Sequence, residues 1–221
     1  MKFTLLIPTL NEIDGVRAIM PRINNNWVDE IIVVDGGSTD GTYQYFEENN
    51  YKIIKQQSKG VTGAYWEGME ASIGDVIIAF SPDNNSIPET IPLLVEEMQE
   101  GYDMVIASRY YQDAKSEDDD IVTALGNWMF TKIVNILFGS DYTDSLVMFR
   151  AFKKNIPYEY KMQSRKHPTF ELELAIKCAK HKLKVKDIPV DEPKRIGGKR
   201  KMRPLYNGAT LIVKITSEVV I

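Results

Sequence analysis

Short apolar runs alternate with longer segments of helical periodicity along most of this chain. β-Branched and aromatic residues dominate six runs typical of buried strands, at residues 3–7, 31–34, 52–54, 76–80, 104–107 and 184–190. Between them, the spacing of apolar residues predicts helices at residues 12–20, 42–49, 61–73, 89–100, 122–138 and 169–181. This alternation favours an α/β fold whose mostly parallel sheet is covered by helices on both faces.

Polar side chains follow three of the predicted strands at the point where each strand ends. Thr9 and Asn11 follow the first strand, Asp35 follows the second, and Asp83 follows the fourth. In open parallel sheets, ligands bind at the carboxyl ends of the strands. We therefore expect these side chains to converge on one edge of the sheet and to form a site there.

Composition narrows the class of protein. A chain of 221 residues with 43% apolar content can build one sizeable core, so we expect a single domain over residues 1–221. The net charge of −4 argues against general nucleic-acid binding, and the local basic run at residues 194–203 predicts a compact anion as its partner. The only cysteine, Cys178, lies in an apolar pattern and is expected to be a core thiol in a reducing, cytoplasmic compartment. No signal peptide or long apolar span is apparent, so the chain is expected to be soluble or at most membrane-associated.

Two strand-end segments carry the first candidate chemistry. In Pro8-Thr-Leu-Asn-Glu12, the proline fixes a turn and Asn11 is placed to cap a helix that opens at Glu12, and a plain strand-to-helix turn is the alternative. In the segment 30–42, Asp35 precedes a loop rich in glycine and small hydroxyl residues, which suits a carboxylate that holds ribose hydroxyls or a base edge. Asp40 in the same loop is expected to cap the next helix.

Pro8-Thr-Leu-Asn-Glu12 and Val34-Asp-Gly-Gly-Ser-Thr-Asp-Gly-Thr42 together resemble the opening of the family 2 glycosyltransferases, which are inverting enzymes with the nucleotide-diphospho-sugar transferase fold called GT-A. Segments at 59–60, 74–75, 107–110, 144–152, 173 and 187–190 follow the family's pattern in the family's order. The resemblance covers about residues 3–203 and is closest to the dolichyl-phosphate (polyprenyl-phosphate) mannosyltransferase branch.

The resemblance implies a division of labour along the chain. It implies a nucleotide-sugar-binding half at about residues 3–110, an acceptor half at about 111–203, and a C-terminal apolar helix at 204–221. It also implies a GDP- or UDP-sugar donor and an acceptor that is a polyprenyl phosphate or a glycan. The donor-binding residues that it implies are Pro8, Thr9, Asn11, Glu12, Asp35, Gly60, Ser81, Asp83, Arg195 and Lys201.

Asp83 matches the last acid of the family's Asp-x-Asp motif, which holds a divalent cation that bridges the two phosphates of the donor. Mg²⁺ and Mn²⁺ prefer oxygen ligands and need only one or two carboxylates when phosphates and waters complete the shell. Ser81 and Pro82 replace the first two positions of the motif, and Asn84 and Asn85 add neutral oxygens. Loss of the leading acid leaves a metal-poor or inactive site as the alternative.

The basic segment Arg195-Ile-Gly-Gly-Lys-Arg-Lys201 resembles the family's Arg-x-x-Gly-x-x-Lys loop, which closes over the donor diphosphate or an acceptor phosphate. Arginine offers a bidentate fork to phosphate oxygens, lysine offers a point charge, and the paired glycines let the loop move. A solvated tail or a patch against anionic lipid headgroups is the alternative.

Asp144 opens a segment similar to the family's Asp-x-x-Ser-Gly-Phe-Arg-x-Phe, whose acid lies beside the acceptor. Val147 and Met148 replace the small Ser-Gly pair, so the acceptor pocket should have a different shape. Asp144 is therefore a base for a sugar hydroxyl or an orienting group for a lipid phosphate. Arg150 is expected to hold an acceptor phosphate or to pair with Asp144, and Glu173 to orient either; structural ion pairing is the alternative for both.

Several features leave alternatives open. The helix at 122–138 is apolar nearly all round, which favours core packing or a face resting on a bilayer. The acidic run at 116–120 is expected to be solvated. Two rival functions are a nucleotide-sugar-binding protein without turnover and a sugar-phosphate nucleotidyltransferase, although residues 8–12 lack the glycine-rich, arginine-containing loop of the latter class.

Overall fold

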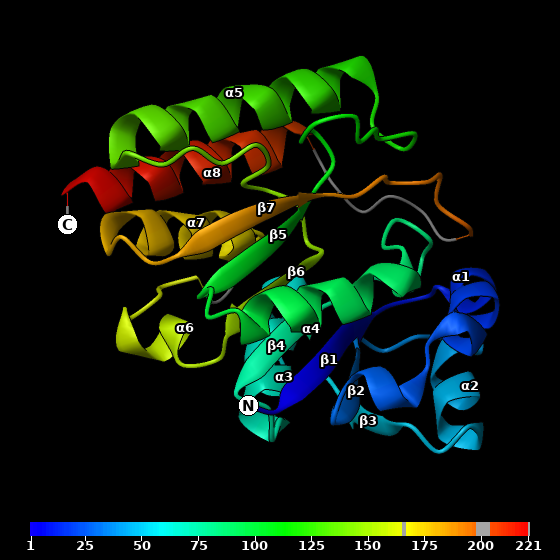
Figure 1. The fold of residues 1–221 in the computed structure, drawn as a ribbon. Helices are drawn as coiled ribbons and strands as arrows, with labels where there is room; N and C mark the ends of the chain where they lie inside the picture. The colour runs from blue at the N-terminus through cyan, green and yellow to red at the C-terminus, as the bar shows by residue number, and fades with distance from the viewer. Residues whose placement is uncertain (165–166, 198–203, 221) are drawn as a thin grey trace.

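A mostly parallel sheet runs through the centre of the molecule (Figure 1). The computed structural model describes residues 1–164, 167–197 and 204–220, and the side chains of 204 and 205 are outside that description. Among these residues the sheet has seven strands in the order β3-β2-β1-β4-β6-β5-β7. The strands are β1 (Phe3–Thr9), β2 (Glu30–Asp35), β3 (Lys52–Lys55), β4 (Val76–Ala79), β5 (Met104–Ser108), β6 (Arg150–Lys153) and β7 (Val185–Pro189).

Helices cover both faces of the sheet, as the alternating pattern predicted. They are α1 (Ile13–Ile19), α2 (Thr42–Glu48), α3 (Gly60–Ala71), α4 (Ile91–Gln99), α5 (Ile121–Phe138), α6 (Ile156–Glu159), α7 (Phe170–Lys180) and α8 (Pro204–Val220), with short 3₁₀ turns at Met20–Arg22, Asn25–Trp27 and Pro88–Thr90. Helix α3 packs on β1 and β2, whereas α4 packs on β5 and β6. All six predicted strands and all six predicted helices are present, and the expected fold class is confirmed.

The core explains why the central strands read as unbroken apolar runs. Every residue of β4 is buried, and so are the central residues of β1 and β2, because helices shield the sheet on both sides. Cys178 on α7 is fully buried, and burial raises the pKa of its thiol to about 12. The expectation of a core thiol is therefore confirmed.

One strand was not predicted. Strand β6 lies antiparallel between β4 and β5, with Ala151 opposite Ile78 on one side and Val105 on the other. Its four residues include no β-branched side chain, whereas β3, which also has a charged residue at each end, contains Ile53 and Ile54. Because β6 begins opposite the carboxyl ends of β4 and β5, the loop that precedes it, residues 139–149, arrives at the edge where the predicted site lies.

Candidate active site

The ends of β1 and β2 present two buried oxygen atoms that lack partners. Thr9 and Asp35 are register partners on these adjacent strands and are 5% and 3% exposed. Asp35 Oδ2 accepts hydrogen bonds from the N–H groups of Gly37 and Ser38 at 2.9 and 3.0 Å. Among the described residues, Asp35 Oδ1 and Thr9 Oγ1 have no hydrogen-bond partner. Because a buried polar atom without a partner is costly, this pair is suited to a ligand that supplies hydroxyl or N–H groups.

A cavity of about 270 Å³ opens beside Asp35. Gly37 in its wall has φ of +94°, a left-handed conformation in which glycine avoids steric strain and lets the backbone approach a ligand closely. Lys55 Nζ lies 4.7 Å from the centre of the Tyr43 ring, so the wall also carries an aromatic face and a cation. The residues that line the cavity are Asp35, Gly37, Ser38, Tyr43, Gln44, Lys55 and Gln56.

The other residues expected near the donor lie around the same edge. Pro8 lies within β1, Glu12 directly precedes α1, Gly60 is the first residue of α3, and Ser81 lies in the turn after β4. Gly60 has φ of +78°, and its carbonyl accepts a hydrogen bond from Gln56, which lines the cavity. These positions come from four different parts of the chain, and the sheet brings them to one side.

Hydrogen bonds join the loops after β1 and β2. Asn11 was expected to cap α1, but that prediction was wrong: its Oδ1 accepts from the N–H of Thr39 at 2.8 Å, and it has φ of +53°. Asp40 was expected to cap α2, but the N-cap of that helix is Gly41; Asp40 accepts from the N–H of Thr42, the first residue of α2, and also from the N–H of Ile13 at the start of α1. One carboxylate therefore fixes the beginnings of two helices.

Asp83 and Arg195, which are 112 positions apart in the sequence, form an ion pair. Arg195 Nη1 lies 2.6 Å from Asp83 Oδ2. The N–H of Asn85 donates to Asp83 Oδ1 at 3.1 Å, so both carboxylate oxygens are engaged. The structure thus brings together the predicted metal ligand and the first cation of the predicted phosphate loop.

The chain after β7 is held against the turn that carries Asp83. Residues 191–197 extend from β7 toward α1 in Figure 1, and the N–H of Ile196 donates to the carbonyl of Asp83 at 2.8 Å. Asn84 has φ of +78°, and its Nδ2 donates to the carbonyl of Lys194 at 2.8 Å. The predicted residue Lys201 lies outside the described residues. The described part of the basic segment therefore meets the acid turn through its backbone as well as through Arg195.

Gly15 on α1 allows this close approach. A Cβ atom at residue 15 would lie 2.6 Å from the carbonyl oxygen of Pro82, 2.9 Å from Cα of Asp83 and 2.9 Å from the carbonyl oxygen of Ile196. Such contacts are shorter than atoms tolerate, so only glycine fits without displacing backbone. Helix α1, the Asp83 turn and the segment after β7 consequently meet at one point.

Asp144 is buried and pairs with an arginine that was not predicted to be its partner. Its Oδ2 lies 2.7 Å from Nε of Arg109, and its Oδ1 lies 3.2 Å from Nη2. Oδ1 also accepts from the N–H groups of Leu146 and Val147. The predicted pairing of Asp144 with Arg150 was therefore wrong, because the fork of Arg109 occupies both carboxylate oxygens.

Arg109 sits among three carboxylates. Its Nη1 lies 3.2 Å from Asp119 and 3.3 Å from Glu192, in addition to its contacts with Asp144. Burial alone would lower the pKa of Arg109, but the charges of Asp144 and Glu192 raise it above its usual value. Burial raises the pKa of Glu192, although Arg109 acts in the opposite direction. This cluster ties the end of β5 to the loop before β6 and to the chain after β7.

The acidic run at 116–120 was expected to be solvated, and for much of it that expectation was wrong. Ser116 Oγ hydrogen-bonds to Glu192, and Asp119 accepts from Asn127 Nδ2 at 3.0 Å as well as from Arg109. Asp120 caps α5 by accepting from the N–H of Thr123 at 2.7 Å. The run is ordered because a buried arginine and a helix N-terminus attract its carboxylates.

Arg150 and Glu173 hold backbone rather than contacting Asp144. Arg150 is 1% exposed and donates to the carbonyls of Val147, Ser145 and Glu171. Glu173 is fully buried and accepts from the backbone N–H groups of residues 163 and 164, each at 2.6 Å. These contacts favour a structural role for both residues; the expected ion pairing is seen for Glu173, which lies 3.2 Å from Lys214, whereas Arg150 binds carbonyls.

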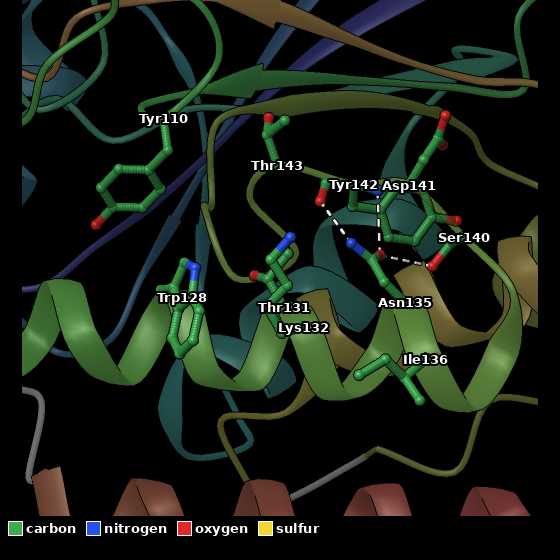
Figure 2. A pocket seen from close by; sticks show the side chains of 10 residues that line it. All are labelled: Tyr110, Trp128, Thr131, Lys132, Asn135, Ile136, Ser140, Asp141, Tyr142 and Thr143. Carbon is green, nitrogen blue, oxygen red and sulfur yellow. Dashed lines mark hydrogen bonds between the residues drawn. The ribbon is translucent and has the colours of Figure 1, made fainter.

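A second cavity, of about 570 Å³, lies between α5 and residues 140–143 (Figure 2). Trp128, Lys132 and Ile136 contribute from α5, and Asn135 Nδ2 donates to the carbonyl of Tyr142 at 2.8 Å across its floor. Tyr110, next to Arg109 in the chain, forms part of its wall. The cavity therefore adjoins the Arg109 cluster.

The model of the family described as Glycosyl transferase family 2 matches residues 4–165, which include β1 to β6 and the ends of the strands described above. The chain belongs to glycosyl transferase family 2. This glycosyltransferase is accordingly an enzyme, and the expected resemblance is confirmed.

Two curated relatives show how far the similarity extends. The chain is 24% identical over 213 residues to "Glycosyltransferase AglJ" of Haloferax volcanii, covering 96% of this chain and 70% of the relative. It is 34% identical over 128 residues to the dolichol-phosphate mannosyltransferase of Pyrococcus furiosus, covering 53% of this chain and 36% of that protein. The chain therefore spans only part of the length of these relatives.

Solved structures share the fold. Glucosyl-3-phosphoglycerate synthase from Mycobacterium tuberculosis, in complex with Mn²⁺, UDP and phosphoglyceric acid, superposes with a TM-score of 0.77 at 20% identity, over 100% of this chain and 79% of that one. The GT-A fold expected for this glycosyltransferase is confirmed.

The residues of this glycosyltransferase fit a cation that is shared with a bound diphosphate. Within the described residues, no three histidine, cysteine, aspartate or glutamate side chains form a metal-binding group. The buried carboxylate of Asp83 nevertheless binds a cation that belongs to the chain itself, the guanidinium of Arg195. Mg²⁺ and Mn²⁺ are commonly held by one or two carboxylates together with substrate phosphates and water. Asp83 supplies one carboxylate of this kind.

Sequence reasoning missed the importance of Arg109. The segment 107–110 was noted only as a landmark of the family, although Arg109 directly follows buried strand β5, while Asp35 is the last residue of β2 and Asp83 lies in the turn after β4. A charged residue immediately after an apolar run was the available signal. Its acidic partners come from distant segments, which no spacing in the sequence reveals.

Proposed function

We propose that this glycosyltransferase transfers a sugar, with inversion at the anomeric carbon, from a nucleoside-diphosphate sugar to a polyprenyl phosphate. The observation that carries the proposal is the row of strand ends at one edge of the sheet. There, the unpartnered oxygens of Thr9 and Asp35 lie on β1 and β2, and β1 pairs in turn with β4, the strand that leads to the Asp83–Arg195 pair. Such an edge offers a nucleoside site and a phosphate site side by side.

The nucleoside of the donor is assigned to the cavity beside Asp35. The free Oδ1 of Asp35 would accept from a ribose hydroxyl, and Thr9 Oγ1 would bond nearby. Pro8, Asn11, Glu12 and Gly60 would shape this edge, Asn11 through its side-chain bond to Thr39 and Gly60 through its carbonyl. UDP- and GDP-sugars are both candidates, since the cavity constrains the ribose more clearly than the base.

The donor diphosphate is assigned to Asp83 and to the basic segment. Asp83, with the neighbouring Ser81, would hold Mg²⁺ or Mn²⁺, and the ion when bound neutralises negative charge on the departing diphosphate. Arg195 is already next to this position and would turn its fork from Asp83 to phosphate oxygens. Lys201, in the same segment, would add a second cation.

The state of Asp144 favours a phosphate acceptor over a glycan hydroxyl. Both oxygens of Asp144 are bonded to Arg109 or to backbone N–H groups, and the side chain has no solvent exposure. A carboxylate in this state is poorly placed to remove a proton, whereas a phosphate acceptor is already an anion and requires placement only. We therefore assign Asp144 to positioning Arg109 and the loop that precedes β6, with Arg150 and Glu173 supporting that loop and its surroundings.

The similarity to a dolichol-phosphate mannosyltransferase supports a lipid acceptor of this kind. A glycan acceptor is the second candidate. With a lipid acceptor the enzyme would act at a membrane surface, on the cytoplasmic side, which suits the free thiol of Cys178.

Transfer assays test this function. The protein is incubated with labelled UDP- and GDP-sugars, Mn²⁺, and either a polyprenyl phosphate or a set of oligosaccharides. We expect label in the organic phase, in the β configuration when the donor is an α-linked sugar nucleotide. Transfer to oligosaccharides only would show that the acceptor is a glycan and not a polyprenyl phosphate. Donor binding without release or transfer of the sugar would favour a binding protein without turnover.

A further inference from the structure

Both charged residues of helix α8 point toward the protein, as do the buried Leu211 and Ile215, and its exposed positions are all uncharged. Lys214 and Glu218 are its only charged residues. Lys214 lies 3.2 Å from Glu173, and the buried Glu218 lies 2.9 Å from Lys177 on α7. The exposed positions between 206 and 220 are Tyr206, Ala209, Ile212, Val213, Thr216, Val219 and Val220.

Helix α5 has the same inverted arrangement. Its polar side chains bond inward: Asn127 donates to Asp119, Thr131 bonds to Ser145, and Asn135 donates to the carbonyl of Tyr142. Its outward positions are large and apolar, with Ile121 88% exposed and Ile136 79% exposed. The exposed apolar residues are Ile121, Val122, Leu125, Trp128, Met129, Ile136 and Leu137.

The two helices pack against each other along one side of the molecule (Figure 1). A Cβ atom at Gly208 of α8 would lie 3.9 Å from the ring of Phe130 of α5, which places the helices in direct contact. We call their exposed apolar positions the α5–α8 face. The outward positions of a surface helix in water are normally polar or charged, whereas those of α5 and α8 are mostly apolar, so this face is built for an apolar environment.

We propose that the α5–α8 face rests on a lipid bilayer, with its apolar side chains at the boundary between headgroups and acyl chains. This inference deepens the proposed function by naming the surface that meets the lipid, but its evidence is the orientation of side chains and does not depend on the sugar or the acceptor. Trp128 and Tyr206 are residue types that favour the membrane interface. The cavity of Figure 2 shares Trp128 and Ile136 with the face.

Contacts of α5 favour lying on the bilayer over crossing it. Among the described residues α5 is the one helix that is long and apolar enough to span a membrane. Its inward polar groups are, however, bonded to the body of the protein, through Asp119, Ser145 and Tyr142. Inserting the helix across a bilayer would break these bonds and leave the polar groups in hydrocarbon.

Charge favours a membrane over a second copy of the chain. Lys132, the only charged residue of α5, lies among its exposed apolar positions; its long side chain can reach the headgroups of a bilayer, but a two-fold pairing of this face would press it onto an apolar surface. The sequence directly before α8 contains the basic run at 194–203, although the chain as a whole is acidic. Basic residues beside an interfacial helix attract anionic lipid.

Vesicle binding by the whole protein, without donor or acceptor, tests the proposal. Vesicles of phosphatidylcholine, with and without phosphatidylglycerol, are sedimented with the wild type and with the double variant Leu125→Glu and Ile136→Glu. We expect the wild type to bind, more tightly when phosphatidylglycerol is present, and the variant to bind at least about tenfold more weakly. Leu93→Glu, which places the same charge on an exposed apolar position of α4, is the matched control and should bind like the wild type.

Trp128 provides a test that does not depend on a charged substitution. Lipids brominated on their acyl chains should quench tryptophan fluorescence in the wild type and not in Trp128→Phe, because Trp66 is buried and Trp27 lies outside the face. The proposal is overturned if the wild type does not bind vesicles or if the double variant binds as well as the wild type. It is also overturned if the wild type is a dimer and the two substitutions make it a monomer. If the donor still raises the melting temperature of the double variant, its loss of vesicle binding is not due to a damaged donor site, and the membrane proposal is tested separately from the proposed function.

Discussion

Arg195 Nη1 lies 2.6 Å from Asp83 Oδ2, so the basic segment after β7 is closed on the acid at the end of β4. The Asp83 side chain is 3% exposed, which makes the guanidinium its main counter-charge. A divalent cation that binds Asp83 must therefore compete with Arg195 for the same carboxylate. Arg195, once displaced, is left beside the phosphates that accompany the ion. Cation binding and phosphate binding should consequently be linked.

Replacing Asp83 with asparagine should remove the metal-dependent part of donor binding. The amide keeps the size of the side chain but has no charge to hold Mg²⁺ or Mn²⁺. We expect UDP or GDP to stabilise Asp83→Asn equally with Mn²⁺ and with a chelator, whereas the wild type gains extra stability from Mn²⁺. Thermal-shift titrations measure this difference. Asp113→Asn, at an exposed loop position, is the control, and an undiminished Mn²⁺ effect in Asp83→Asn would reject the metal role.

Arg195→Ala should weaken nucleoside diphosphate binding and change the response to metal alone. Loss of hydrogen bonds to a charged ligand costs about 1.5–3 kcal/mol, or about ten- to a hundredfold in Kd. The Kd of Arg195→Lys should lie between those of Arg195→Ala and the wild type, because lysine keeps the charge but lacks the bidentate guanidinium. Without donor, Asp83 loses its counter-charge, so Mn²⁺ should stabilise Arg195→Ala more than the wild type. Calorimetric titration and thermal shifts measure the two effects; equal stabilisation by Mn²⁺ would show that the ion and Arg195 do not share Asp83.

Asp35→Asn should reduce the preference for an intact ribose. The free Oδ1 of Asp35 is the expected acceptor for a ribose hydroxyl, and losing that bond should weaken UDP or GDP binding by about tenfold. Comparison with 2′-deoxy and 3′-deoxy nucleotides separates this contact from the phosphate site. The wild type should discriminate against at least one deoxy nucleotide and the variant should not. If both proteins discriminate alike, the ribose lies elsewhere.

Gly15→Ala should disturb the Asp83 turn although Gly15 touches no ligand. The added methyl group would meet the carbonyl of Pro82 and Cα of Asp83, and overpacking of this kind costs about 1–3 kcal/mol of stability. Gly126→Ala is the matched control, because residue 126 lies in α5 with no atom within 4 Å of its Cβ position, and alanine there should stabilise by about 0.5–1 kcal/mol. Urea unfolding compares the two, and Mn²⁺-dependent donor binding should be weaker only in Gly15→Ala. A neutral effect at residue 15 would mean that α1 moves away without cost.

The sequence was informative wherever a local pattern decides the structure. Apolar runs predicted six of the seven strands in the described residues, and a carboxylate at the end of a run predicted where Asp35 and Asp83 would meet the sheet edge. Strand β6 contains no β-branched residue, because only Ala151 and Phe152 lie between its charged ends. Its place is decided by pairing with β4 and β5, which local patterns do not express.

Partners of charged residues were the other feature that sequence left open. Arg109 was passed over, and Arg150 was offered as a partner of Asp144 or of an acceptor phosphate, because both arginines are compatible with the same acid until the fold places them. The structure separates them by their surroundings: Arg109 faces carboxylates, and Arg150 faces carbonyls. The contact between Arg195 and Asp83 likewise depends on Gly15, whose role is visible only as a distance.

Glu173 predicts a pH dependence of stability. Burial acts to raise the pKa of Glu173, but hydrogen bonds from Gln163 and Ser164 and the charge of Lys214 lower it below its usual value. A carboxyl group whose pKa is lower in the folded protein stabilises the fold above its unfolded pKa of about 4.3, and this contribution is lost as the pH falls through the lower, folded value. Glu173→Gln should therefore reduce the free energy of unfolding at neutral pH by about 1–3 kcal/mol.

The difference between the wild type and Glu173→Gln should shrink as the pH falls below about 4, because the wild-type carboxyl group then also loses its charge. Urea unfolding at neutral and acidic pH measures it. Glu89→Gln is the control: Glu89 pairs with Arg22 at 2.7 Å on the surface, where an ion pair contributes only about 0–1 kcal/mol. Because Glu173 joins Lys214 of α8 to the loop at residues 163–164, its charge is expected to hold the inverted helix in place. A Glu173→Gln difference that stays constant with pH would show that shape, and not charge, attaches α8.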